Sequence, residues 1–357
     1  MSMLSEIGAH ASARREQLYN LLNKSTRWLD VLGFGWIVPI LRIMVGDSPR
    51  EQLQDLREKI LVPVLGIVIF LLAWSFLAPQ VNTSLGAIPT PVKVWEQAEG
   101  LMDDYRAARR REEAFYARQN ERNAAFIAQG EPDRVRHFEY TGQPTYLDQI
   151  LTSLRTVGLG FLIATLIAVP LGIASGLSRT VHGALNPLIQ LFKPVSPLAW
   201  LPIVTMVISA VYVDASEALP KSLVISAVTV TLCSLWPTLI NTAMGVASID
   251  KDLMNVGKVL QLSTFTTIRK LVLPSAMPLI FTGLRLSLSV GWMVLIAAEM
   301  LAQNPGLGKF VWDEFQNGSS NSLARIMVAV LTIGIIGFAL DRVMYALQSA
   351  FTFQANR

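Results

Sequence analysis

Charge is nearly absent from the C-terminal part of this 357-residue chain. Residues 151–357 contain 13 Lys and Arg and 8 Asp and Glu, so only about a tenth of this stretch is charged, whereas a soluble domain is near a quarter charged. The stretch is as long as a large domain, and so little charge does not suit contact with water. We therefore expect most of it to be embedded in a lipid bilayer.

The composition also excludes several classes of protein. An apolar content of 52% rules out a disordered or purely fibrous chain. The single cysteine, Cys233, excludes a disulfide framework and a cysteine-based metal site. The three histidines lie far apart in the sequence, at His10, His137 and His182. We predict no metal site and no bound cofactor in this chain.

Apolar runs long enough to cross a bilayer occur six times. A spanning helix needs about 20 apolar residues, and the stretch from Ile60 to Ala78 carries no charge at all. The other predicted spans are residues 156–176, 185–212, 222–246, 275–300 and 324–345. The first span is not a cleaved signal peptide, because about 58 mostly polar residues precede it. The sequence thus predicts an all-α polytopic membrane protein.

Basic residues in the short loops set the orientation. With the N-terminus in the cytoplasm, the inner loops contain Arg179, Lys251, Lys258, Arg269 and Lys270, and the outer loops contain Lys221 and Lys309. We expect residues 1–58 and a short tail, residues 348–357, to be cytoplasmic. We expect residues 79–149 to form an external loop and the protein to lie in the inner (plasma) membrane of a cell.

Two segments outside the spans are predicted to be helical. Residues 31–45 are apolar but too short to cross, and we interpret them as a helix lying in the inner interface; a buried turn of an N-terminal subdomain is the alternative. Residues 101–128 combine helix formers with mixed charge, which predicts a solvated external helix with pairs such as Arg109–Glu113. Their interleaved acids and external location exclude nucleic-acid binding.

No motif of a known enzyme class is present. Residues 306–309 read GLGK but lack the spacing of a phosphate-binding P-loop, and the chain has no HExxH, GxSxG or dinucleotide-binding motif. His182 is the one histidine near a span and falls in a cytoplasmic turn, so nothing is placed to activate a nucleophile in the membrane. We expect no catalytic residues and no ATP hydrolysis by this chain.

The third predicted span is broken by prolines. Pro187, Pro194, Pro197 and Pro202 each remove a backbone donor, and in lipid such a backbone is tolerated only against protein or a water-filled cavity. The segment is either a kinked packing helix or the wall of a transport pathway. Lys193 favours the pathway, because a charge at membrane depth indicates function.

The longest inner loop, residues 247–272, contains a short amphipathic helix. Asp250 or Asp252 is suited to cap it, and apolar residues recur at Leu253, Val256 and Leu260. Such a helix either docks into a groove on a cytoplasmic partner or packs back onto the bundle as a surface helix.

This loop resembles the coupling-helix signature of ATP-binding-cassette importer permeases, EAA-x3-G-x9-I-x-LP in its common form. The run from Asn255 to Gly257 stands in place of EAA and Gln261 in place of the glycine, and Leu271, Leu273 and Pro274 close the motif. The sequence differs from the common signature at the EAA and glycine positions. The residues that dock are therefore expected from the resemblance alone.

The flanking sequence is similar to the permease branch for nitrate, sulfonates, taurine and bicarbonate. The similar segments are residues 88–91 (IPTP), 153–155 (SLR), 283–286 (GLRL), Trp292 and 297–301 (AAEML), while residues 192–202 (FKPVSPLAWLP) resemble nitrate-type members. The resemblance covers about residues 60–100 and 145–347. The N-terminal 55 residues and the charged insert at about 101–140 lie outside it.

The resemblance implies a type I importer permease fold and a set of partners. A core of five membrane helices occupies residues 150–347, with a coupling helix at about 250–262. The partners are a second permease copy, two cytoplasmic ATPases that hold ATP and Mg²⁺, and an external solute-binding protein. An ion-coupled secondary transporter or channel is the alternative of a different class; such proteins often contain internal repeats, and none is evident here.

The resemblance also implies two sets of functional residues. The residues expected to couple to the ATPase are Asp252, Leu253, Asn255, Val256, Gly257, Leu260, Gln261 and Leu262. The residues expected along the translocation path are Lys193, Ser196, Trp200, Arg285, Trp292 and Glu299.

Alternatives stay open for the charged members of the path. Lys193 and Arg285 are placed at a similar depth by the helical rise, where they would attract an anion. Lys193 could instead extend toward the inner surface, and Arg285 could form an ion pair with an acid of a neighbouring loop. Glu299 would repel an anion, so a structural role or a contact with the binding protein suits it better.

The expected substrate is a small oxyanion. Nitrate or nitrite fits the nitrate-type segment best, with bicarbonate, cyanate, taurine and alkanesulfonates as alternatives in the same branch. An oxyanion needs fixed positive charge or hydrogen-bond donors near its path, held weakly enough to release it.

Overall fold

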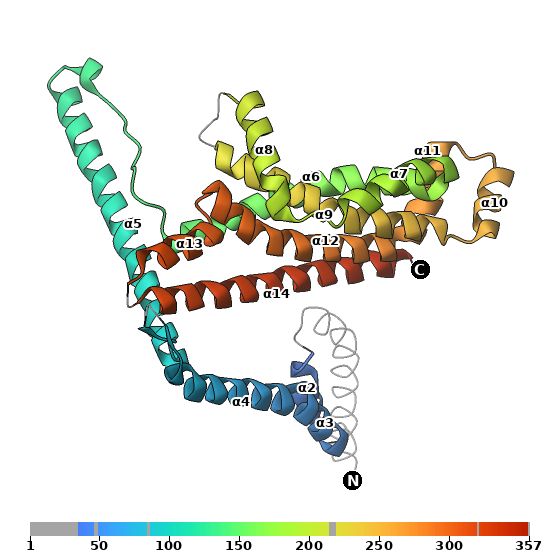
Figure 1. Ribbon diagram of the computed structural model, residues 1–357, viewed down its shortest axis with the longest axis horizontal. Coiled ribbons are helices and arrows are strands. Elements are labelled where there is room, and N and C mark those ends of the chain that lie inside the picture. Colours follow the sequence, from blue (N-terminus) through green and yellow to red (C-terminus); the bar gives the residue numbers. More distant parts are fainter. Residues whose placement is uncertain (1–34, 46–48, 84–85, 214–218, 320, 356–357) are drawn as a thin grey trace, which may run out of the picture.

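The computed structural model describes residues 35–45, 49–83, 86–213, 219–319 and 321–355. In this part of the chain nearly all regular structure is helical (Figure 1). The helices are α2 Ile37–Val45, α3 Pro49–Leu56, α4 Val62–Leu77, α5 Pro91–Ala128, α6 Tyr146–Leu177, α7 Arg179–Phe192, α8 Pro197–Val211, α9 Lys221–Ala247, α10 Lys251–Val259, α11 Thr264–Thr267, α12 Leu273–Ala302, α13 Leu307–Asn317 and α14 Ser322–Ala355.

Five helical stretches in the described part are long and apolar enough to cross a membrane: Glu51–Gln80, Tyr146–Leu177, Lys221–Ala247, Thr264–Ala302 and Ser322–Phe351. The prediction of membrane-spanning helices is confirmed, and their bounds agree with five of the six predicted spans to within a few turns at the ends. Short π-helical turns at Arg57–Leu61 and Ile268–Val272 precede α4 and α12. Two short strands, β1 Asn82–Thr83 and β2 Gly86–Ala87, form a small antiparallel pair after α4.

The third predicted span is not one continuous helix. Residues 185–212 are divided between α7 and α8, whose axes differ by 103°. Pro194 and Pro197 cause the break, since neither supplies a backbone donor and Pro197 holds Ser196 in an extended conformation (φ −63°, ψ 141°). The chain also begins α7 at Arg179, directly after the Ser178 cap, where the sequence suggested a loop.

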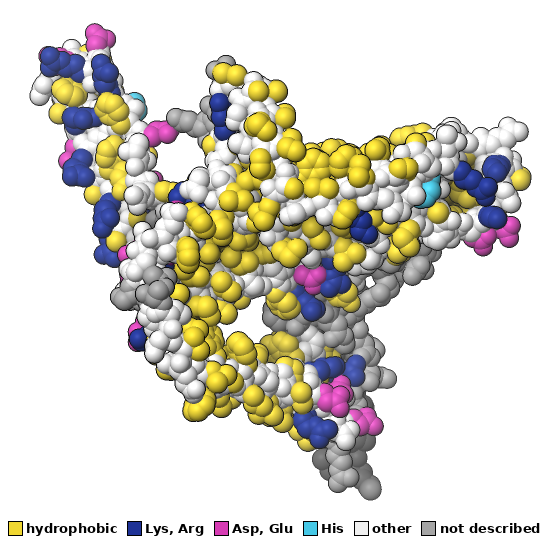
Figure 2. All heavy atoms as spheres, in the orientation of Figure 1, with side chains coloured by type: hydrophobic (Ala, Val, Ile, Leu, Met, Phe, Trp, Pro, Cys, Tyr) yellow, Lys and Arg dark blue, Asp and Glu magenta, His cyan; other side chains and the backbone are white. Residues whose placement is uncertain are grey.

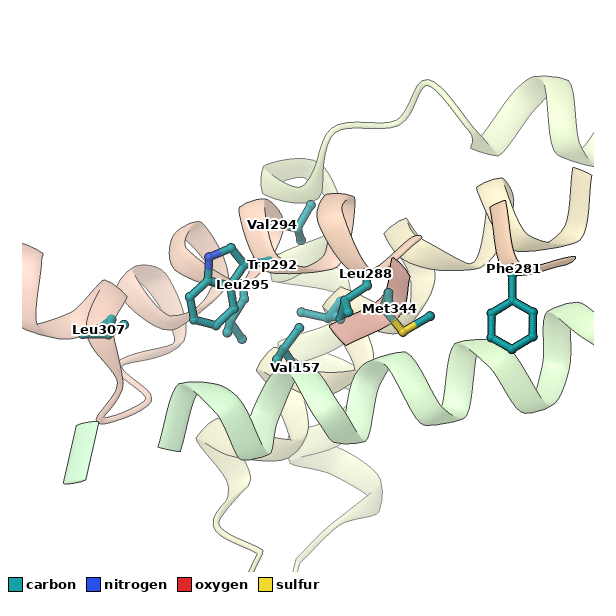
Figure 3. Packing of buried hydrophobic residues seen from close by; sticks show 9 residues of the cluster. Val157, Phe281, Leu288, Trp292, Val294, Leu295, Leu307 and Met344 are labelled. Atoms are coloured by element: carbon teal, nitrogen blue, oxygen red, sulfur yellow. The ribbon is translucent and has the colours of Figure 1, made fainter. Parts of the chain in front are cut away.

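The core lies where α6 and α12 pack against α9 and against each other. Small residues recur every fourth position along α6, at Gly160, Ala164, Ala168, Gly172 and Gly176, and let the two backbones approach closely. A methyl group on Gly160 would lie 2.7 Å from the Ala227 carbonyl oxygen. The larger apolar side chains of the core come mainly from α12 and pack with others from α6, α9, α13 and α14 (Figure 3).

Polar contacts reinforce the α9–α12 interface. The Ser287 hydroxyl of α12 contacts the Thr238 hydroxyl at 2.7 Å and accepts from the Thr238 backbone N–H at 3.1 Å. It also donates to the Ser234 carbonyl oxygen. Pro237 interrupts the backbone hydrogen bonding of α9. The Ser287 contacts therefore supply hydrogen bonds to backbone groups that lipid could not bind.

Several predicted boundaries move. The charged external helix, predicted from residue 101, begins at Pro91 as α5, because Thr90 is extended and Pro91 occupies the first helical position. The predicted C-terminal tail from residue 348 is instead the last part of α14, which has no Pro or Gly there and is held by stacking of Phe351 on Phe281 with ring centres 5.4 Å apart. Of the predicted interfacial helix 31–45, residues 37–45 form α2 and residues 31–34 lie outside the described part.

Apolar side chains cover most of the visible face of the bundle and of α4 and α8 (Figure 2). No side chain of α4 is buried within this chain. At one end of the bundle α10 projects outward, and at the other α5 extends well beyond the helices that pack on it (Figure 1).

Candidate functional site

One face of α7 is polar along its whole length. Its polar side chains recur every three to four residues at Arg179, His182, Asn186, Gln190 and Lys193, so they form one stripe along the helix. Ser178 caps this helix by accepting from the Val181 N–H at 3.4 Å. We call these five residues the α7 polar stripe.

The α7 polar stripe lines a cavity of about 1020 Å³ between α7 and the C-terminal parts of α6 and α9. The facing wall is mainly apolar and includes Leu239, Ala243 and Met244. No acidic residue is among the described residues that line it. The cavity therefore combines two basic side chains and two amides with an apolar wall, a combination that favours anions over cations.

The stripe has few partners inside the protomer. The His182 Nδ1 atom lies 3.1 Å from the Ser175 hydroxyl. In the described residues, the side chains of Arg179, Asn186, Gln190 and Lys193 form no hydrogen bond or ion pair. In a membrane such groups require water, a partner chain or a passing ligand.

Three of the predicted path residues lie at the bend between α7 and α8. Lys193 ends α7, with its N–H donating to the Ile189 carbonyl oxygen at 3.0 Å. Ser196 caps α8 by accepting from the Leu198 N–H at 3.3 Å. The Trp200 ring centre lies 5.7 Å from that of Phe192, across the bend. Of the three, Lys193 lines the α7 cavity.

Arg285 and Trp292 are placed elsewhere, between α12 and α14. The Arg285 guanidinium binds the Asp341 carboxylate through two hydrogen bonds of 2.5 and 2.7 Å, and the Trp292 indole N–H donates to the Ile333 carbonyl oxygen at 3.0 Å. Both line a separate cavity of about 200 Å³. The acid that pairs with Arg285 comes from α14 and not from a loop, and the structure does not bring Arg285 and Lys193 to a common cavity.

Glu299 is completely buried at the end of α12 that faces α13. Its carboxylate accepts from the Ser153 hydroxyl of α6 at 2.8 Å and from the Gly308 backbone N–H at 3.0 Å. The Ser153 hydroxyl in turn accepts from the Leu307 N–H at 2.9 Å. This geometry is that of a structural clasp joining three helices, and complete burial does not suit the alternative of a contact with a binding protein.

Glycine is required beside this clasp. A Cβ on Gly306 would lie 2.1 Å from the Glu299 Oε1 atom, and one on Gly308 would lie 2.1 Å from the Ile296 carbonyl oxygen. The GLGK sequence, which fails as a phosphate loop, is thus explained by the close approach of its backbone to Glu299.

The predicted coupling segment forms α10 and the turn after it. The Asp250 side chain caps the helix by accepting from the Asp252 N–H at 2.9 Å. Val256 and Leu260 are 50% and 63% exposed, whereas Gly257 is buried against Leu271. The predicted segment thus presents an exposed apolar face at the end of the molecule.

The turn after α10 explains the glycine of the common signature. Gln261, at that position, has a left-handed backbone (φ 50°), which glycine adopts most readily. The Gln261 N–H donates to the Lys258 carbonyl oxygen and the Leu262 N–H to the Gly257 carbonyl oxygen, each at 3.0 Å. This is the double hydrogen bond of a Schellman helix end. Gln261 and Leu262 therefore lie beyond the helix itself.

Sequence reasoning missed four members of the α7 polar stripe: Arg179, His182, Asn186 and Gln190. Their spacing was visible in the sequence, but the residues before 185 were assigned to a loop and the prolines drew attention to the following segment. A helical-period search of residues 178–193 would have found them.

Comparison with known proteins matches this chain to membrane components of transport systems in every case below. Residues 168–352 match the family model described as "Binding-protein-dependent transport system inner membrane component". The chain is 31% identical over 308 residues to the nitrate import permease protein NrtB of Synechocystis sp., which covers 85% of this chain and 95% of that protein. It is 34% identical over 307 residues to the bicarbonate transport system permease protein CmpB of Synechococcus elongatus, covering 85% and 94%. The taurine transport system permease protein TauC of Escherichia coli is 35% identical over 208 residues, covering 58% of this chain and 70% of that protein.

Proposed function

The chain belongs to the family of binding-protein-dependent transport system inner membrane components, and from this premise we propose that it forms the translocation path for a small oxyanion, nitrate or nitrite first. It is the multi-pass permease component of an ATP-binding-cassette importer and not its ATPase. Its family implies a partner ATPase and an external binding protein.

The observation that carries the oxyanion proposal is the α7 polar stripe. Arg179 and Lys193 supply positive charge along a cavity whose described lining includes no acid, and Asn186 and Gln190 supply amide donors. These donors bind an anion more weakly than a closed ring of arginines would, which suits passage rather than capture. Lys193 is the member of the predicted path that we place at this wall.

The relatives narrow the substrate without separating its nearest candidates. Their names specify nitrate, bicarbonate and taurine transport. Nitrate and bicarbonate are both small, planar, singly charged oxyanions, so the stripe suits either. We propose nitrate because the segment from Phe192 to Pro202, which ends α7 and begins α8, resembles nitrate-type permeases.

We also propose how the complex is assembled. Two copies of the chain form the path, with α8 and α12 facing their common axis, and two ATPases dock on the exposed apolar face of α10. Exposed apolar side chains on α8, such as Ile203, Met206 and Val207, suit contact with a second copy. The N-terminus and the α10 end are cytoplasmic, and residues 79–149 are outside.

Uptake into proteoliposomes tests the substrate. The complex is reconstituted with its ATPase and binding protein, and labelled nitrate is competed with unlabelled nitrite, bicarbonate, cyanate and taurine. We expect ATP-dependent nitrate uptake that nitrite competes most strongly. Stronger competition by bicarbonate or taurine would reassign the substrate, and uptake driven by an ion gradient without ATP would favour a secondary transporter.

A further inference from the structure

The charged insert that lies outside the common permease pattern forms a helix with a returning segment packed along it. It consists of α5 from residue 106 onward and the returning segment 129–144, which we call the external arm. Polar side chains of α5 hold the returning backbone: the Asn123 amide donates to the Arg136 carbonyl oxygen at 2.9 Å, and the Gln119 side-chain oxygen accepts from the Phe138 N–H at 2.7 Å. Gln119 and Asn123 are buried although the arm stands apart from the bundle.

The arm is fixed to the bundle at its base. Arg109 forms ion pairs of 2.6 Å with Glu112 and with Asp148, and Asp148 belongs to the capping box that begins α6. Hydrogen bonding to Glu112, with a further contribution from the charge of Asp148, raises the pKa of the Arg109 guanidinium above its ordinary value. Arg109 therefore links the arm to the first turn of α6.

A second ionic link joins the part of α5 just before the arm to α13 and α14. Arg325 of α14 lies 3.4 Å from the Asp104 carboxylate of α5 and 3.3 Å from the Glu314 carboxylate of α13. The 38 residues of α5 give a helix about 57 Å long at about 1.5 Å per residue. A displacement of α5 would thus be transmitted to α6, α13 and α14.

The arm carries a basic and aromatic groove with a volume of about 820 Å³. Arg118 and Arg122, one turn apart on α5, line it together with Phe115, Phe138 and Tyr140. The Arg122 guanidinium carbon lies 5.8 Å from the Phe138 ring centre. Figure 2 shows basic side chains along the arm.

The two groove arginines have no acidic partner among the described residues. The Arg118 Nε atom donates to the Ala114 carbonyl oxygen at 3.1 Å, and Arg122 contacts a ring. Glu139 is the one acid in the described lining, so the groove keeps an excess of positive charge. Arginine and aromatic side chains are the residue types that contribute most to protein–protein binding.

We propose that the external arm docks the solute-binding protein of this importer, with an acidic patch of that protein seated against Arg118 and Arg122. The proposal rests on the proposed orientation, which places residues 79–149 outside. Charge favours this partner over pairing of the grooves of two permease copies, because two basic grooves would repel each other. The apolar surfaces of α4 and α8 suit the second copy better.

A pair of double variants tests the proposal. Arg118→Glu with Arg122→Glu reverses both groove charges, and Arg106→Glu with Arg110→Glu makes the same change one turn apart on another face of the same helix. The affinity of fluorescently labelled binding protein is measured for the permease–ATPase complex in nanodiscs. We expect the groove variant to bind about tenfold or more weakly and the control to stay within about twofold.

Two further readouts separate the possible outcomes. ATP hydrolysis without binding protein should be the same in both variants, which shows that the complex is folded. A Thr141→Cys probe in a Cys233→Ser background should cross-link to the binding protein. Equal binding by the two variants, or cross-linking to another permease copy, would overturn the proposal. Labelling of Thr141→Cys from the cytoplasmic side alone would instead overturn the orientation, and with it the proposed function.

Discussion

Glu299 and Arg285 are ionisable residues within the membrane-spanning bundle, and other parts of the chain bind the side chains of both. A charged side chain at membrane depth usually marks a functional site. Glu299 is bound by Ser153 and Gly308, and Arg285 by Asp341. Lys193 differs because no acid of the described residues meets it. An ionisable residue type therefore indicates a special role at all three positions. A binding partner within the chain indicates a structural role, and the lack of an acidic partner among the described residues indicates a role in transport.

Removing the Glu299 carboxylate should destabilise the bundle. Glu299→Ala leaves the Ser153 hydroxyl and the Gly308 N–H without their acceptor, at about 1–3 kcal/mol for each buried unsatisfied group. We expect a lower thermal unfolding temperature for the purified permease, with Glu299→Gln in between because it keeps one oxygen. Glu113→Ala, on an exposed part of α5, is the control. A Glu299→Ala protein as stable as this control would contradict the clasp.

Lys193 and Arg285 should fail in different ways when their charge is removed. Lys193→Met should lower nitrate uptake per folded complex by roughly ten- to a hundredfold, at 1.36 kcal/mol per decade, and Lys193→Arg should retain more. Arg285→Met strands the Asp341 carboxylate and should lower the yield of folded complex. Uptake and yield are measured on the same reconstituted samples. Unchanged uptake per complex in Lys193→Met would remove it from the path.

At the scale of elements, the apolar face of α10 is expected to fill a groove on the ATPase. Val256→Asp or Leu260→Asp places a charge in that groove at a cost of several kcal/mol unless it is paired. Co-purification of the ATPase and transport should both fail, while membrane insertion is kept. Thr180→Asp adds the same charge at another cytoplasmic helix start and should leave co-purification of the ATPase unchanged. Normal ATPase recruitment by both α10 variants would exclude the docking role.

The elements themselves were largely predictable, because five apolar runs are long enough to cross a bilayer and their internal prolines do not end the helix. The bend between α7 and α8 was not. Pro194 and Pro197 predict that a helix stops, but the direction of the next helix depends on packing of Leu201 and Val204 against α9 and α12, which are distant in sequence. The α7 polar stripe was missed for the related reason that its first turn, from Arg179, was assigned to a loop.

For charged residues, too, positions along one helix were predictable and contacts between distant helices were not. Lys193 was predicted on the path and lines a cavity, whereas the pairing of Arg285 with Asp341 requires α12 and α14 to be placed side by side. Arg109 was expected to pair with Glu113, and the structure instead pairs it with Glu112 and Asp148. Periodicity along one helix predicts exposed faces well, and it does not reveal which distant acid completes a contact.

At the scale of the whole molecule, an apolar surface remains that this chain does not cover. Ile203, Met206 and Val207 of α8 are all more than half exposed, while Leu201 and Val204 are buried. Single cysteines at these five positions, in a Cys233→Ser background, should form dimers at the first three and not at the last two. Absence of cross-links along α8, or cross-links from α4 alone, would contradict the proposed two-fold axis.

The account depends most on the claim that the α7 polar stripe faces water and selects anions. Cys233→Ser gives a background without cysteine, into which His182→Cys, Asn186→Cys or Gln190→Cys is introduced. Leu188→Cys and Leu191→Cys, exposed on the other side of the same helix, are the matched controls. Each reconstituted protein is treated with an anionic or a cationic methanethiosulfonate reagent of similar size, and the labelling rates are compared.

We predict that the three stripe cysteines react, that the anionic reagent labels them faster because Arg179 and Lys193 are near, and that the preference shrinks at high salt. The two leucine positions should label slowly with both reagents. Stripe cysteines that stay unreactive, or that react faster with the cationic reagent, would contradict the claim that α7 lines the path of an oxyanion.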